Sequence, residues 1–282
     1  MKFVFKTLLL VLFSFGLLFS QTKQPVKEVR AIWITTAGNL DWPPSASSGE
    51  IAQKAAATRF LDAMKSNNFN TAVLQVRARG SLLYPSEVEP WAQCMTGIFG
   101  RDPGWDPLQF WIEECHKRGI ELHAWWNFSN VAVTSTPPQS IGLPHVGVTH
   151  PTWVKAVGNE MYMDVGYPEV REYLVNTAME MVRNYDIDAI HFDFIRYSDN
   201  IDDAWDQDAF SAYNPDNLTR ADWRRENINM FVRAIYDSIK SIKPYVKVGS
   251  APIGIYDRMI GVSNGWYCYS DVFCDPKRWL RE

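Results

Sequence analysis

Residues 187–197, with the sequence IDAIHFDFIRY, decide the fold, because they place one carboxylate, Asp193, inside an almost continuous apolar run. A run rich in β-branched and aromatic residues is typical of a strand in a parallel sheet that is covered on both faces. Alternate side chains of a strand share a face, so His191, Asp193 and Ile195 are expected on one side. A carboxylate in such surroundings costs free energy unless it is paired or used. Asp193 is therefore either an ion-pair partner or a functional group.

Similar apolar runs occur along the chain and alternate with helical patterns, which favours a parallel α/β fold. No G-x-G-x-x-G motif follows the first run, and no phosphate-binding loop motif occurs, so a nucleotide-binding sheet is disfavoured. Polar residues gather where the runs end, and long loops follow, as in a (β/α)8 TIM barrel. The expected strands are residues 29–36, 71–77, 120–128, 187–197 and 245–252, and the expected helices are 49–67, 107–118, 168–185 and 220–243.

The spacing of these strands predicts how much of a barrel the chain holds. The strands begin at residues 29, 71, 120, 187 and 245, so eight units would need more than about 400 residues. We therefore expect an α/β fold of the (β/α)8 TIM-barrel type, truncated after about five β/α units. The last residues, DPKRWLRE, are expected to begin a further helix.

The N-terminus predicts export. Residues 1–21 have the pattern of a signal peptide, with Lys2 and Lys6 before an apolar run at residues 8–19. Residues 22–27 form a short polar tether, and residues 28–282 form one domain. We expect a periplasmic or extracellular protein without stable membrane insertion after cleavage of the signal.

Composition narrows the classes of partner. The net charge is −4 and the chain has no basic stripe, which disfavours nucleic acid and favours a neutral partner such as a sugar polymer. The five His and four Cys have no metal-ligand spacing, and no serine-hydrolase motif occurs, so neither metal nor cofactor is expected. Cys268 and Cys274 either pair or remain buried thiols, like Cys94 and Cys115. The oligomeric state stays open.

Charged residues at two strand ends are the first candidates for chemistry. Asp193 could act as a nucleophile or stabilise an oxocarbenium-like transition state, with Arg196 and Tyr197 holding it ionised. Gln75 and Arg77 end the second strand. Arg77 could bind sugar hydroxyls or form an ion pair with Asp193 or a neighbouring acid.

Aromatic and amide residues are the second group of candidates. Asn127, at the end of the third strand, could bind a hydroxyl group, and Trp126 could either stack on a sugar or pack in the core. Trp42 is a stronger stacking candidate, because two prolines after it are expected to hold its loop away from the core. Asp41 is a possible second acid. Asp164 is better explained as a loop residue near a helix start.

Several segments in order resemble the glycosyl-hydrolase-like family ten, a bacterial family formerly described as a domain of unknown function. The resemblance implies a (β/α) barrel that acts on glycans, including cell-wall glycan strands without peptides. It also implies that Asp193 is the leading catalytic position and that Arg77, Asn127, His191 and Arg196 line the site. The sequence WWNFSN departs from the Asn-Pro-Tyr-Arg that relatives often carry there. The matching segments are residues 28–43, 74–127, 150–154, 162–175 and 188–198.

These observations predict a glycoside hydrolase that acts on a polysaccharide by a two-carboxylate mechanism with Asp193 at its centre. The second acid is either Asp41 or a residue of strands that this sequence does not contain. Two alternatives remain, namely a non-catalytic carbohydrate-binding protein derived from a hydrolase and an inactive fragment.

Overall fold

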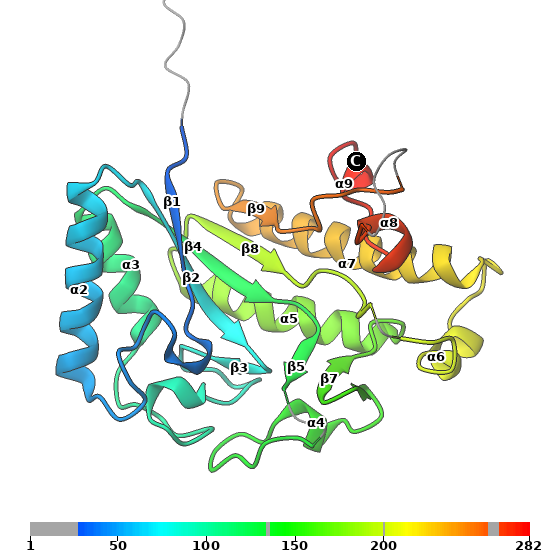
Figure 1. The fold of residues 1–282 in the computed structure, drawn as a ribbon, viewed down its shortest axis with the longest axis horizontal. Helices are drawn as coiled ribbons and strands as arrows, with labels where there is room; N and C mark the ends of the chain where they lie inside the picture. Colours follow the sequence, from blue (N-terminus) through cyan, green and yellow to red (C-terminus); the bar gives the residue numbers. More distant parts are fainter. Residues whose placement is uncertain (1–27, 134–135, 200, 259–264) are drawn as a thin grey trace, which may run out of the picture.

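The computed structural model describes residues 28–133, 136–199, 201–258 and 265–282, so the predicted signal peptide and tether lie outside the described residues. Five parallel strands form its main sheet, in the order β1-β2-β4-β8-β9, and the short β3 (Ser81–Leu82) pairs antiparallel with β2 (Figure 1). β1 and β9 are the edges of this open sheet. The five strands are β1 (Ala31–Ile34), β2 (Thr71–Ala78), β4 (Glu121–Asn127), β8 (Ala189–Asp193) and β9 (Lys247–Ser250).

Long helices alternate with these strands, which confirms the predicted order of elements. Local sequence explains where the helices begin. The Asp106 side chain accepts a hydrogen bond from the Gln109 backbone N–H at 3.0 Å, and Pro107 occupies the first helical turn. Thr219 caps the last long helix in the same way. The four helices are α2 (Glu50–Ser66), α3 (Pro107–Lys117), α5 (Pro168–Asn184) and α7 (Arg220–Ile242).

The strand that carries Asp193 is shorter than predicted. β8 ends at Asp193, because Phe194 adopts a left-handed backbone with φ 55° and leads the chain out of the sheet. The expectation of a strand up to residue 197 is therefore wrong. The turn puts Asp193 at the carboxyl end of the strand, where TIM-barrel-type folds place functional groups.

The two faces of the main sheet differ. One face packs against the helices and is dry: Trp126 and Phe192 lie edge to face at 5.6 Å, and Phe192 meets Phe231 of α7 at 5.4 Å. Burial of a large apolar side chain stabilises the fold by about 1.5–3 kcal/mol. On the opposite face Trp33 is 40% exposed, and the side chains of Trp125 and His191 are partly exposed. We call this second surface the open face.

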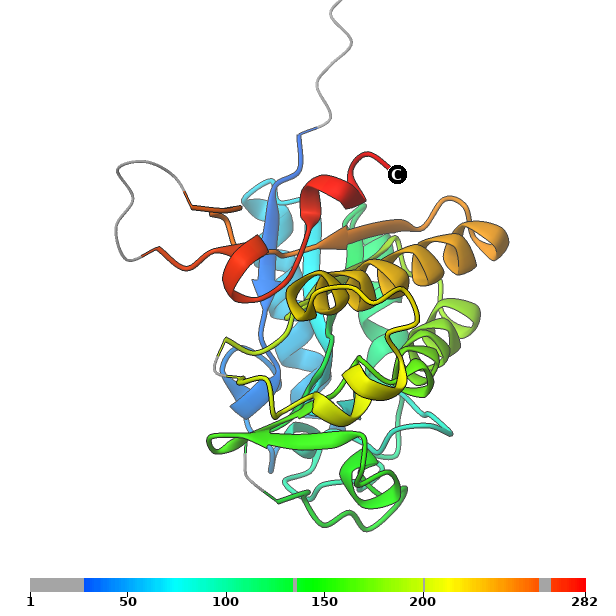
Figure 2. The ribbon, with the colours of Figure 1, turned by 90° about the vertical axis from the view of Figure 1, so that its right-hand side faces the viewer.

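A second, antiparallel sheet follows the end of β4 and was not predicted. Its order is β5-β7-β6, and β5 begins three residues after β4 ends. The green strands of this sheet lie below the main sheet in Figures 1 and 2. The strands of this second sheet are β5 (Asn130–Ala132), β6 (Val154–Val157) and β7 (Glu160–Met163).

Short helices lie in the loops between the longer elements. They are η1 (Ala37–Asn39), η2 (Gln93–Met95), α4 (Val146–Thr149), α6 (Gln207–Ala212), α8 (Cys268–Asp271) and α9 (Pro276–Trp279). No described helix is long and apolar enough to cross a membrane.

Candidate functional site

The parallel register brings together two predicted site residues at adjacent strand ends. Asn127 of β4 lies opposite Asp193 of β8. The Trp125 indole N–H donates to the Asn127 side-chain oxygen at 2.8 Å, and the Phe194 backbone N–H donates to the Asp193 carboxylate at 2.8 Å. The turn after β8 therefore supplies a hydrogen bond to the carboxylate that the strand presents.

The surroundings of Asp193 oppose its charge. Burial raises the pKa of the Asp193 carboxyl, and this outweighs the lowering by the Phe194 N–H, Arg196 and Trp125. A carboxyl that is partly buried and has a raised pKa is a candidate for proton transfer. The direction of this shift does not support the expectation that Arg196 and Tyr197 hold the carboxyl firmly ionised.

An aromatic cluster lies beside this carboxyl on the open face. The ring of Trp33 meets Trp125 edge to face at 4.9 Å and His191 at 4.8 Å. Burial, followed by the nearby His123, lowers the pKa of His191, so this imidazole is neutral over a wider pH range than a free histidine. Indole and neutral imidazole rings next to a carboxyl form a surface suited to the apolar face of a sugar ring.

Arg196 extends the site on the other side of Asp193. Its guanidinium lies 4.9 Å from the centre of the Phe194 ring and 4.5 Å from that of Trp266. The Ser129 hydroxyl donates to the Arg196 backbone oxygen at 3.4 Å. Arg196 is therefore positioned by residues that are distant in the sequence.

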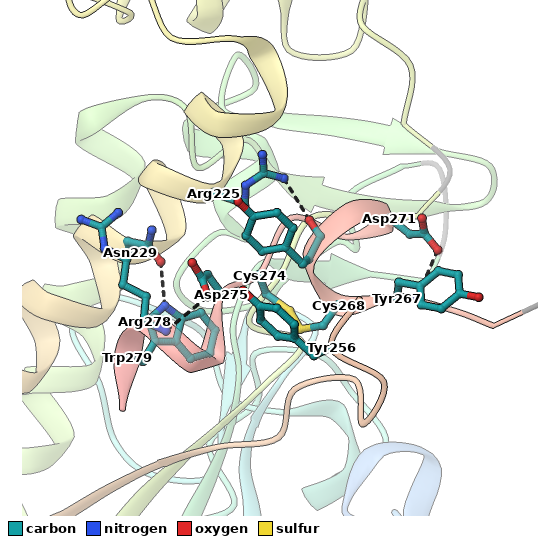
Figure 3. The surroundings of a disulfide bond; sticks show 11 residues. Arg225, Asn229, Tyr256, Tyr267, Cys268, Asp271, Cys274, Asp275, Arg278 and Trp279 are labelled. Atoms are coloured by element: carbon teal, nitrogen blue, oxygen red, sulfur yellow. Dashed lines mark hydrogen bonds between the residues drawn. A yellow bond between two sulfur atoms is a disulfide. The ribbon is translucent and has the colours of Figure 1, made fainter. Parts of the chain in front are cut away.

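A disulfide loop supports the same strand end. Cys268 and Cys274 form a disulfide, whereas Cys94 and Cys115 are free and buried. Figure 3 shows Arg225 of α7 against this loop, where it lies 4.0 Å from the Tyr269 ring centre and donates to the Tyr269 backbone oxygen at 3.0 Å. Val272, inside the loop, accepts a hydrogen bond from the Tyr197 backbone N–H at 3.1 Å.

The structure corrects the expected roles of Gln75 and Arg77. The Gln75 side-chain oxygen accepts the backbone N–H groups of Thr36 and Ala37, both at 3.0 Å, so it closes the turn after β1. Arg77 is fully buried, and its Nε donates to Glu89 at 2.7 Å, with further bonds to the backbone oxygens of Asn127 and Phe128. The ion pair with an acid other than Asp193, one of the two expected alternatives, is confirmed, because the partner of Arg77 is Glu89. Arg77 therefore holds loops together, and its buried side chain is not available to bind sugar hydroxyls.

Three aromatic candidates are also core residues. Trp42 is 1% exposed and its indole donates to the Gln53 backbone oxygen at 3.0 Å, so the expectation of an exposed platform is wrong. Trp126 and Tyr197 are 0% and 2% exposed. Strand alternation contained the missed signal, because Asn127 shares its face with Trp125 and not with Trp126. Trp33 and Trp266 were also missed.

The other acidic candidates take part in local structure. The Asp41 carboxylate accepts the Thr35 backbone N–H at 2.8 Å, within its own loop. Asp164 is fully buried, with Lys155 at 2.9 Å and the Gly166 N–H at 3.0 Å, in agreement with the structural interpretation. Among the described residues, no cluster of three His, Cys, Asp or Glu side chains could hold a metal ion.

The fold is shared with solved structures. An α-L-fucosidase isoenzyme 2 from Paenibacillus thiaminolyticus matches with a TM-score of 0.56 at 14% identity, over 82% of this chain and 33% of that one. A hypothetical protein from Ruminiclostridium thermocellum matches with a TM-score of 0.50 at 14% identity, over 78% of this chain and 96% of that one. These likenesses show the fold alone.

A parallel α/β sheet with a carboxyl and an aromatic ring at its strand ends defines a protein of the TIM-barrel-type α/β class. The chain belongs to the glycosyl hydrolase-like 10 family, whose model matches residues 28–282. It is 35% identical to the glycosyl hydrolase YngK of Bacillus subtilis, over 98% of this chain and 56% of that protein. It is 33% identical to the glycosyl hydrolase DigH of Escherichia coli K12, over 93% of this chain and 64% of that protein. The chain thus spans about three fifths of these relatives.

Proposed function

We propose that the whole protein hydrolyses glycosidic bonds in a polysaccharide, with cell-wall glycan strands as its substrate and Asp193 as the central carboxyl. The family and the names of the relatives support the class of reaction. The observation that carries the residue assignment is the position of Asp193: a partly buried carboxyl with a raised pKa, at the carboxyl end of β8 and near the indole of Trp125.

The direction of the pKa shift favours one of the two roles that a glycosidase carboxyl can take. A general acid must be protonated when it meets the glycosidic oxygen, and burial keeps Asp193 protonated to higher pH. Asp193 donates its proton to the leaving oxygen while the bond from that oxygen to the anomeric carbon breaks. Water attacks the anomeric carbon and gives its proton to a second carboxylate. This assignment replaces the nucleophile role expected from the sequence.

The carboxyl end of β4 supplies part of the binding surface for this reaction. Trp125 lies near Asp193, and its hydrogen bond to Asn127 fixes the orientation of the indole. A sugar ring that stacks on these side chains would place its glycosidic oxygen near the carboxyl. Correct placement of the reacting groups is itself a large part of catalysis.

The decisive experiment measures reducing ends released by the full-length protein from peptide-free cell-wall glycan strands. Asp193→Asn is expected to lower kcat about 10²–10⁴-fold, because the amide cannot donate the required proton. Asp216→Asn, at an exposed loop position after α6, is the matched control and should retain activity. An unchanged rate for Asp193→Asn would exclude Asp193 as the central carboxyl.

The upper limb of the pH profile tests the general-acid role. If Asp193 is the general acid, kcat falls as the pH rises through its raised pKa. A kcat that does not fall at high pH would exclude Asp193 as the general acid. Glycan binding that survives Asp193→Asn, without release of reducing ends by the unaltered protein, would favour the carbohydrate-binding alternative.

We also propose export, on the signal-peptide pattern of residues 1–21. Edman sequencing of the mature protein should begin near residue 22. A mature protein that retains Met1 would contradict this proposal.

A further inference from the structure

Two aromatic rings from distant parts of the sequence contact the Arg196 guanidinium. Its central carbon lies 4.9 Å from the centre of the Phe194 ring and 4.5 Å from that of Trp266. Phe194 precedes Arg196 by two residues, whereas Trp266 lies in the C-terminal segment after β9. A guanidinium over an aromatic ring is attracted to it, most strongly when the ring is an indole. The place of the guanidinium therefore depends on a residue outside the turn that carries it.

Phe194 connects Arg196 to the Asp193 carboxyl. The Phe194 backbone N–H donates to the Asp193 carboxylate at 2.8 Å, and its backbone oxygen accepts the Arg196 N–H at 2.8 Å. Arg196 lies near enough to Asp193 to lower the pKa of this carboxyl, although burial has the larger effect and raises it. Arg196 is thus the charged side chain that opposes the effect of burial on Asp193.

Other groups also attract the Arg196 guanidinium. Glu160 and Tyr162 of β7 and the exposed Asp199 act on it together with Asp193, and all four raise the pKa of Arg196, while burial lowers it and dominates. A long arginine side chain has many rotamers, so it can turn toward any of these groups or toward water unless a contact fixes it. The ring of Trp266 supplies such a contact.

The backbone next to Trp266 is itself fixed. The Tyr267 N–H donates to the Asp271 carboxylate at 3.0 Å, which Figure 3 shows, and the Cys268 N–H donates to the Ile255 backbone oxygen at 2.9 Å. The disulfide then closes the loop that begins at Cys268. Trp266 is 39% exposed, so the loss of its ring would remove little core packing. A fixed backbone thus presents a largely dispensable ring to Arg196.

We propose that Trp266 is a positioning residue that stacks on Arg196 and so holds the guanidinium beside the Asp193 carboxyl. The proposal deepens the proposed function and rests on it for the role of Asp193 as the general acid. A positive charge nearby stabilises the carboxylate, so the ring of Trp266 limits how far burial favours the protonated form. A general acid is most effective when its pKa lies near the working pH. Trp266 therefore adjusts the acid through Arg196.

The test is an NMR titration of the Asp193 carboxyl in the full-length protein without substrate. The protein carries ¹³C-labelled aspartate, and the Asp193 signal is the one that Asp193→Asn lacks. Trp266→Ala should bind the proton at Asp193 about 3-fold to 10-fold more tightly, because the guanidinium moves away from the carboxyl. Trp266→Phe, which keeps a ring under the guanidinium, should retain most of the original titration. In Trp266→Ala, the fall of kcat at high pH should also begin at a higher pH.

A second pair of variants shows whether Trp266 acts through Arg196. Arg196→Met should tighten proton binding at least as much as Trp266→Ala, and Trp266→Ala should have no further effect in the Arg196→Met background. Trp279→Ala is the matched control, because it removes an indole from the same C-terminal segment that donates to Asn229 at 2.7 Å. It should leave the Asp193 titration unchanged, and thermal melts should show that all variants are folded.

Several results would overturn the proposal. They are an unchanged Asp193 titration in Trp266→Ala, an equal change in Trp279→Ala, and an effect of Trp266→Ala that persists without Arg196. Because the titration does not depend on activity, the two proposals fail separately. If the titrations follow expectation but Asp193→Asn still hydrolyses glycan, the positioning role stands and Asp193 is not the central carboxyl. If Asp193→Asn is inactive but Trp266→Ala titrates like the unaltered protein, the positioning role alone fails.

Discussion

The ends of β2 and β8 both carry charged side chains, but the two side chains differ in their burial and in their ion-pair and hydrogen-bond partners. At β2, Arg77 is completely buried, yet it is bonded to Glu89 and to two backbone oxygens. At β8, Asp193 is half-buried and accepts the Phe194 N–H at 2.8 Å, beside the open face. A buried charge whose ion pair and hydrogen bonds are all formed is typical of a structural residue. A charged group that has too few such partners and lies near the surface is typical of a functional residue.

The pKa values express this difference. Burial lowers the pKa of Arg77, but Glu89 outweighs burial and the net shift is upward, so the charged form of Arg77 is stabilised. The pKa of Asp193 is also raised, but by burial, so its charged form is destabilised. Shifts in the same direction therefore mean opposite things for a base and an acid.

The largest expected effect tests the β2 end. Arg77→Met should reduce the free energy of unfolding by about 3–5 kcal/mol, because it leaves Glu89 buried without a counter-charge. Arg77 also stacks over Trp126, with its guanidinium 4.3 Å from the ring centre. Urea denaturation measures the change, and Arg79→Met, two residues away but exposed, should stay within about 0.5 kcal/mol. A loss below about 1 kcal/mol for Arg77→Met would contradict the conclusion that the charge at the β2 end is structural.

An intermediate effect tests what supports the β8 end. Replacement of Cys268 and Cys274 by serine opens a loop with a sequence separation of 6, which should cost about 2 kcal/mol in chain entropy. Hydrogen exchange should accelerate at the Tyr197 amide, which donates to Val272 inside the loop. The Leu83 amide, bonded to Val76 at the β2 end at 3.0 Å, is the internal control. Equal acceleration at both amides would show that the disulfide does not act locally.

The smallest expected effect is a gain in stability. The folded pKa of Asp193 lies above its unfolded value, so the protonated carboxyl is favoured by folding. This contribution is fully present below the unfolded pKa and is lost as the pH rises through the folded pKa. At neutral pH, Asp193→Asn should therefore raise the free energy of unfolding by about 0.5–2 kcal/mol, as measured by denaturant titration. This gain in stability should vanish in acid. A gain that does not depend on pH, or none at all, would contradict the account of this strand end.

Much of the fold could be predicted from the sequence, because the parallel strands are continuous apolar runs and two of the long helices, α3 and α7, begin at capping side chains. The α/β, TIM-barrel-type class and the position of Asp193 at a strand end are confirmed. The roles of the site residues stay predictions. The β5-β7-β6 sheet was missed, because its strands have three or four residues each and no long apolar run.

Contacts across long stretches of sequence explain the remaining errors. Glu89 lies 12 residues after Arg77 in a loop, and nothing local indicates that it is buried with that arginine. Trp42 was expected outside because of the two prolines after it, but its ring meets Trp111 of α3 at 5.3 Å and joins the core. Such partners are decided by tertiary packing, which overrides local preference.

The wide sequence separation of the contacts around β8 also has a consequence for how the protein folds. Ser129 reaches Arg196 across 67 residues, and Tyr197 meets Val272 beyond α7. Contacts between residues far apart in the sequence form late during folding, because the conformational entropy of the chain between them must be lost before the contact can form. The strand end at Asp193 should therefore be among the last parts to become ordered, after β2 and β4 have paired. During synthesis, a chain that has not yet reached the disulfide loop would therefore hold the end of β8 without the contact between Tyr197 and Val272.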